Sequence, residues 1–75
     1  MSLTAHNAER ILARWAGELH TLPPRERVDL VRRRQRQIKR DLERAPTPGI
    51  RARLNDARLA FDAIASTALN GARNA

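Results

Sequence analysis

The sequence predicts an all-α fold of three helices, and three observations support this prediction. Apolar residues recur every three or four positions in three separate stretches, which is the spacing of an amphipathic helix. All four prolines lie between these stretches, where they interrupt helical geometry. Only Trp15 and Phe61 are aromatic, whereas alanine, arginine and leucine are abundant, so the composition favours helices over a β-sheet core. We expect residues 1–75 to form a single helical domain.

The first helix is expected over about residues 7–20, after a loosely held segment at residues 1–5. Its apolar stripe consists of Ala8, Ile11, Leu12, Trp15, Ala16 and Leu19. The other side carries Arg10, Arg14 and Glu18, one turn apart, and is interpreted as a solvated face with a weak ion pair. Trp15 lies in the middle of the stripe, and we interpret it as an anchor of the core or of a partner interface.

The second helix is expected over about residues 24–45, between two proline-containing breaks. Its predicted seam consists of Val28, Val31, Gln35, Ile38, Leu42 and Ala45. The segment contains nine basic and four acidic residues, so it holds five of the seven net positive charges of the chain. Gln35 interrupts the seam. It is either a polar core position that sets register or oligomeric state, or a position at a wet edge.

The third helix is expected over about residues 48–70, beginning after Thr47 and ending near Asn70-Gly71. Its stripe consists of Ile50, Leu54, Ala57, Phe61, Ile64 and Ala68. This heptad-like rhythm matches that of the second helix, which predicts that the two helices pack as an antiparallel hairpin.

Some apolar residues lie outside the stripes, and a chain this short has little surface with which to cover them. The predicted partner interface consists of Trp15, Leu59, Ala63 and Leu69. We expect a homodimer that joins two three-helix units into a larger helical bundle. The alternative is that these side chains are singly exposed, which is common in monomeric proteins.

The composition argues against an enzyme and against metal or cofactor binding. The chain has no cysteine, and His6 and His20 are not accompanied by carboxylates at ligand spacing. It has no serine, histidine and carboxylate set, no paired acids in an apolar setting and no glycine-rich phosphate loop. We therefore expect a non-catalytic protein with no cofactor and no metal site.

Membrane insertion and export are also disfavoured. No apolar run approaches the ~20 residues that a membrane span requires. The first ten residues lack the basic-then-apolar order of a signal peptide. We expect a soluble, cytoplasmic protein without a membrane partner.

The cationic side of the second helix predicts nucleic-acid binding. Arginine binds phosphate through two parallel hydrogen bonds, and each neutralised phosphate releases counterions. The predicted contact residues are Arg32, Arg33, Arg34, Arg36, Gln37, Lys39, Arg40 and Arg44. Gln37 projects between Arg33 and Arg40, and we expect it to contact a base, because glutamine reads adenine and arginine reads guanine. The pattern leaves DNA and RNA equally open.

Two other interpretations of the same helix remain. The chain is an adaptor or inhibitor that docks its cations on an acidic protein surface, with Leu59, Ala63 and Leu69 supplying apolar contact. Alternatively, the cations form only a solvated face. Among these interpretations, the sequence favours a regulatory or accessory protein that binds DNA or RNA phosphates.

Overall fold

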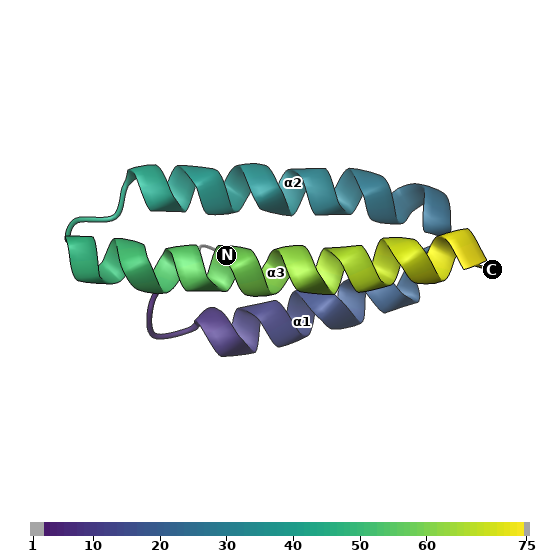
Figure 1. Cartoon of the computed structure of the whole chain (residues 1–75), viewed down its shortest axis with the longest axis horizontal. Coiled ribbons are helices and arrows are strands. Elements are labelled where there is room, and N and C mark those ends of the chain that lie inside the picture. Colours follow the sequence, from purple (N-terminus) through teal and green to yellow (C-terminus); the bar gives the residue numbers. More distant parts are fainter. Residues whose placement is uncertain (1–2, 75) are drawn as a thin grey trace.

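The computed structural model describes residues 3–74, with side chains described for residues 3–70. It contains three helices, α1 (Ala8–Thr21), α2 (Pro24–Glu43) and α3 (Pro48–Asn74), and no strand occurs in the described part of the chain. The helices lie alongside one another in a bundle of 42 × 18 × 18 Å (Figure 1). α2 and α3 run in opposite directions and pack closely, which confirms the predicted hairpin. None of the helices in residues 3–74 is both long and apolar enough to cross a bilayer.

Prolines mark the beginnings of α2 and α3. The carbonyl oxygen of Pro23 accepts the amide hydrogen of Glu26 at 3.0 Å, which starts α2. At the start of α3, the Thr47 hydroxyl oxygen accepts the amide hydrogen of Ile50 at 3.2 Å. This is the expected cap, since Thr47 satisfies an amide of the first turn and Pro48 has no amide hydrogen to leave unpaired.

The predicted end of the third helix was wrong. α3 continues past Asn70-Gly71 to Asn74. A glycine inside a helix costs only about 1 kcal/mol relative to alanine. No proline follows it in the sequence, so the helical hydrogen bonding continues.

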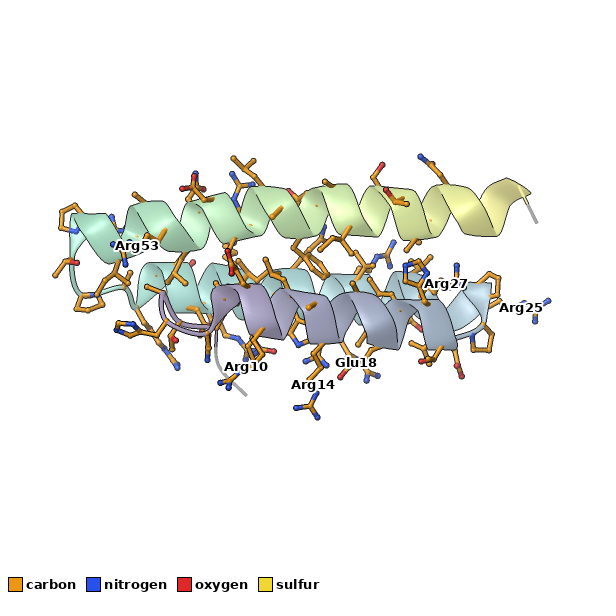
Figure 2. The ribbon with its side chains drawn as sticks, turned by 90° about the horizontal axis from the view of Figure 1, so that it is seen from below. Arg10, Arg14, Glu18, Arg25, Arg27 and Arg53 are labelled. Atoms are coloured by element: carbon orange, nitrogen blue, oxygen red, sulfur yellow. The ribbon has the colours of Figure 1, made fainter. Side chains whose placement is uncertain are left out.

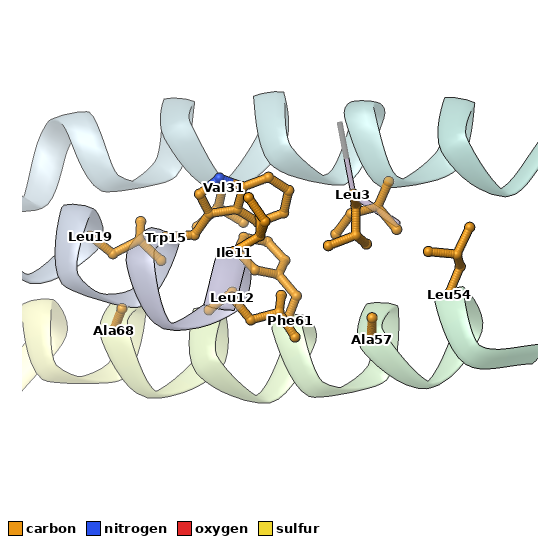
Figure 3. Packing of buried hydrophobic residues seen from close by; sticks show 12 residues of the cluster. Leu3, Ile11, Leu12, Trp15, Leu19, Val31, Leu54, Ala57, Phe61 and Ala68 are labelled. Atoms are coloured by element: carbon orange, nitrogen blue, oxygen red, sulfur yellow. The ribbon is translucent and has the colours of Figure 1, made fainter. Parts of the chain in front are cut away.

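The core is centred on the two aromatic side chains. Trp15 of α1 and Phe61 of α3 meet edge to face, with ring centroids 5.6 Å apart, and both are almost completely buried (Figure 3). The other buried apolar side chains are Leu3, Ile11, Leu12, Leu19, Val31, Ile38, Leu54, Ala57, Ala65 and Ala68. The stripes predicted for the first and third helices are therefore largely the observed core faces.

The N-terminal segment is held more firmly than the sequence predicts, at least from residue 3 onward. Leu3 is 3% exposed and packs in the core. Its amide nitrogen donates a hydrogen bond to Oδ2 of Asp41 at 3.0 Å. The expectation of a loosely held segment is wrong for this residue, and residues 1 and 2 lie outside the described part of the chain.

The seam of α2 differs most from its prediction. Val31 and Ile38 are buried as expected, but Val28 is 38% exposed and Gln35 is exposed, so Gln35 lies at a wet edge. The half-buried side chains of α2 include three charged residues, Arg27, Arg34 and Asp41, which are seven residues apart. Seven residues return to nearly the same side of a helix, so these three form a polar row along the inner side of α2.

Each member of the polar row (Arg27, Arg34 and Asp41) binds a different part of the chain. Arg27 donates to the carbonyl oxygens of Leu22 and Ala68, at 3.0 and 3.1 Å. Asp41 binds the N-terminal segment, and Arg34 binds α1. The prediction failed here because arginine stems were assigned to the flanks of the helix, whereas tertiary partners draw two of them into the seam.

We predict that Phe61→Ala lowers the free energy of unfolding by about 3–5 kcal/mol, because it leaves a cavity against the Trp15 ring. Val28→Ala is the control on α2, where Val28 is 38% exposed. It should change stability by less than about 0.5 kcal/mol. Urea unfolding followed by circular dichroism measures both, and equal losses would contradict the described core.

Candidate nucleic-acid interface

The outer surface of α2 carries five exposed cations: Arg32, Arg33, Arg36, Lys39 and Arg40. They span about 12 Å of helix at 1.5 Å per residue. Among the side chains of residues 3–70, none of the five is engaged in an ion pair or hydrogen bond. These five residues are called the cation cluster below. Their charges are available to a partner without any internal contact having to break.

The cation cluster is arranged on two sides of α2. Arg33 lines a hollow together with Glu18 and Thr21 of α1, so it lies on the α1 side. Gln35 lines another hollow with Asp62 and Ser66 of α3, which defines the α3 side.

Successive residues differ by about 100° around a helix. This spacing places Arg40 with Arg33 on the α1 side, and Lys39 with Arg32 on the α3 side. Arg36 lies between them and points directly outward.

Arg34 is not part of this surface, which corrects its predicted role. Its Nη2 lies 2.8 Å from Oε2 of Glu18, and its guanidinium carbon lies 4.8 Å from the centre of the Trp15 ring. The side chain is only 24% exposed. The ring and the carboxylate stabilise the cation here, while its Nε is buried without a hydrogen-bond partner among the described residues. Arg34 therefore stabilises the bundle and is not available to phosphate.

Gln37 is also drawn inward. Its side-chain oxygen accepts a hydrogen bond from Nη1 of Arg34 at 3.3 Å, and the residue is half-buried. Reading adenine requires both the oxygen and the nitrogen of the glutamine amide. The observed contact uses the oxygen, so the structure does not favour the predicted base contact.

Arg44 is the exposed C-cap residue of α2, one turn after Arg40, and its amide nitrogen donates to the carbonyl oxygen of Arg40 at 3.1 Å. It borders a hollow of about 370 Å³ at one end of the bundle, beside the N-terminal segment and Arg53. Its neighbours there include apolar residues of the core edge, such as Leu3 and Leu54. Arg44 therefore lies at the end of the α2 surface, between the cation cluster and this hollow.

α1 contributes two cations that the sequence interpretation had set aside. Arg10 and Arg14 project from the side of α1 that faces away from α3 (Figure 2). Nε of Arg14 lies 3.6 Å from Oε1 of Glu18, but Glu18 also binds Arg34, and Arg14 remains 63% exposed. α1 packs beside α2, where Glu18 pairs with both Arg14 and Arg34. This proximity comes from tertiary packing, so no sequence pattern identifies it.

The positive surface ends near the turn between α1 and α2. Glu18, Glu26 and Asp29 line a hollow of about 510 Å³ there. These acids reduce the positive potential around the first turns of α2. No set of three or more potential metal-ligating side chains occurs in the described residues.

The residues predicted for a partner interface have mixed outcomes. Trp15 is 2% exposed. It is therefore an anchor of the core, as one interpretation predicted, and the other interpretation, a partner interface, is wrong. Leu59 is exposed on the outer side of α3, as is Ala63, whereas Leu69 is half-buried. Trp15 is covered because α3 supplies Phe61 and α2 supplies the Arg34 guanidinium.

No protein-family model matches the chain, and no curated protein or solved structure is significantly similar to it.

We predict that Arg34 of α2 stabilises the fold, whereas the adjacent Arg33 does not. Arg34→Ala should lower the free energy of unfolding by about 1–3 kcal/mol, because it removes the contacts with Trp15 and Glu18. Arg33→Ala should leave stability within about 0.5 kcal/mol of the parent chain. Thermal and urea unfolding measure both variants, and a larger loss for Arg33→Ala would contradict the assignment.

Proposed function

We propose that this protein is a non-catalytic, cytoplasmic accessory or regulatory protein that binds nucleic-acid phosphates through α2. The observation that carries the proposal is the cation cluster, in which five exposed cations on one helix have no acidic partner among the described side chains. Arg10 and Arg14 of the neighbouring α1 are exposed as well.

The cation cluster binds phosphate without first breaking an internal ion pair. An exposed ion pair would have to separate before its cation reached a phosphate. Each such separation would reduce the free energy gained on binding. The three ion pairs of the described residues involve Arg14, Arg34 and Arg58, none of which belongs to the cation cluster. Each cation that neutralises a phosphate releases condensed counterions, which favours binding at low salt. The net charge of +7 increases the association rate with any polyanion.

We predict that Arg33→Ala combined with Arg40→Ala weakens nucleic-acid binding and reduces the slope of log affinity against log salt by about 2, near 0.9 per lost phosphate contact. The matched control is Arg51→Ala with Arg53→Ala, which removes the same charge from exposed positions on α3. The control should largely keep the slope. Fluorescence anisotropy titrations at several salt concentrations measure both.

Two results would overturn the proposal. One is an equal loss in the two double variants, which would mean that net charge alone determines binding. The other is an absence of binding to DNA and RNA even at low salt. In that case docking on an acidic protein surface would be the remaining interpretation of the cation cluster.

The proposal includes a homodimer formed through the outer side of α3. Leu59 is 53% exposed there. By helical spacing, Ala52, Ala63 and Asn70 share its side, so the described part of this outward line holds no cation. Two chains of net charge +7 repel each other least where no cation lies between them, and small side chains allow close approach. The cation clusters of both copies would then remain uncovered.

We predict that Leu59→Arg lowers the molecular mass measured by size-exclusion chromatography with light scattering from that of a dimer to that of a monomer. Val28→Arg is the matched control, because among residues 3–70 Val28 is the other exposed large apolar side chain, and it lies on α2. It should leave the mass unchanged. A parent chain that is monomeric at every concentration tested would contradict the dimer.

A further inference from the structure

We infer that the nucleic acid bound by the cation cluster is double-stranded B-form DNA, with α2 lying in the major groove. This inference rests on the proposed function and narrows it to one class of nucleic acid. Three features of the bundle lead to it: the burial of both aromatic rings, the position of α2 at a corner of the bundle, and the placement of cations on its two sides.

The burial of the aromatic residues disfavours single strands. Proteins that bind unpaired nucleic acid stack successive bases on exposed aromatic side chains, each worth about 1–3 kcal/mol. Trp15 and Phe61 are the only aromatic residues of the chain, and they are 2% and 0% exposed. The exposed rings of the described residues are the imidazoles of His6 and His20, which lie outside α2 and the cation cluster. The cations of the cluster therefore have to recognise phosphates that a duplex already holds in place.

α2 occupies one corner of a three-cornered bundle. Each helix packs against both of the others, and the cross-section measures 18 × 18 Å (Figure 1). The cation cluster faces away from α1 and α3, so the two neighbouring helices lie behind it. A helix with its side chains is about 10–12 Å wide. The outward part of α2 is therefore of a size that enters a groove of a nucleic-acid duplex.

The width of that groove distinguishes DNA from RNA. The major groove of B-form DNA is about 12 Å wide and admits a helix. The major groove of A-form RNA is deep and narrow, and side chains do not reach its floor. An RNA duplex would contact α2 only through the phosphates at the outside of the duplex. Only one side of α2 would reach these phosphates at a time.

The cations match the two walls of a groove. Arg32 and Arg33 form one adjacent pair, and Lys39 and Arg40 form a second pair seven residues later, about 10.5 Å along the helix. Within each pair the side chains diverge by about 100°. One cation of each pair therefore points toward each wall, and phosphates line both walls. Arg36 lies between the pairs and faces the groove floor.

The same arrangement predicts weak dependence on base sequence. Four of the five cations face phosphates, which position a protein without reading sequence. Gln37 already uses its oxygen in the contact with Arg34. Arg36 alone faces base edges, where arginine prefers guanine. Phosphate contacts therefore dominate the affinity.

The test compares three probes of one sequence and length: a DNA duplex, an RNA duplex and single-stranded DNA. Anisotropy titrations use the full chain, and the three probes are compared at each of several salt concentrations. We expect the DNA duplex to bind at least about tenfold more tightly than either competitor, with a salt slope near −4 from four phosphate contacts. Distamycin, which fills the minor groove, should leave the affinity unchanged.

Variants of the two sides supply the second readout. Arg33→Ala with Arg40→Ala removes the α1-side cations, and Arg32→Ala with Lys39→Ala removes the α3-side cations. Both double variants should lose DNA-duplex affinity by similar factors, because each removes the contacts with one wall. All four residues are exposed, so urea midpoints should match the parent chain.

The outcomes separate the inference from the proposed function. Equal or tighter binding to RNA duplex or to single-stranded DNA overturns the inference and leaves phosphate binding standing. A loss confined to one side of α2, or competition by distamycin, overturns the major-groove placement. Failure to bind any of the three probes overturns the proposed function itself.

Discussion

The contact of Arg34 with Trp15 and Glu18 is the interaction on which the arrangement of all three helices depends. The guanidinium of Arg34 on α2 lies between the indole ring and the carboxylate, both on α1. The other side of the indole contact is Phe61 of α3, so one cluster joins the three elements. A cation is costly to remove from water unless it is paired. Here the ring and the carboxylate offset that cost, and they also determine how α2 is rotated.

The rotation of α2 connects the core to the proposed surface. Arg27, Arg34 and Asp41 hold the inner side of the helix at three levels, through the α1–α2 turn and α3, through α1, and through the N-terminal segment. With the inner side held at three points, helical spacing directs the cation cluster outward. Rotating the helix by one residue, about 100°, would turn one side of the cation cluster toward a neighbouring helix. The same contacts that stabilise the fold therefore present the charges.

The three helices were predictable from the sequence to a greater extent than the candidate nucleic-acid interface. The stripes around Trp15 and Phe61 follow helical periodicity, so the sequence identified these core faces and the hairpin of the second and third helices. In the second helix, the pattern failed at Val28 and Gln35, because periodicity classifies arginine as surface whatever its partners. Arg34 was accordingly assigned to the phosphate-binding set. Arg10 and Arg14 were omitted, since only packing brings α1 beside α2.

The sequence by itself determined the number of helices, their approximate limits and the excess of positive charge on the second, because these depend on local spacing and composition. The tertiary structure decided which arginines are free. A guanidinium becomes structural only when a ring and a carboxylate from another helix surround it, as Trp15 and Glu18 surround Arg34. That outcome depends on contacts between residues far apart in the chain. The spacing of residue types along the sequence does not reveal such contacts.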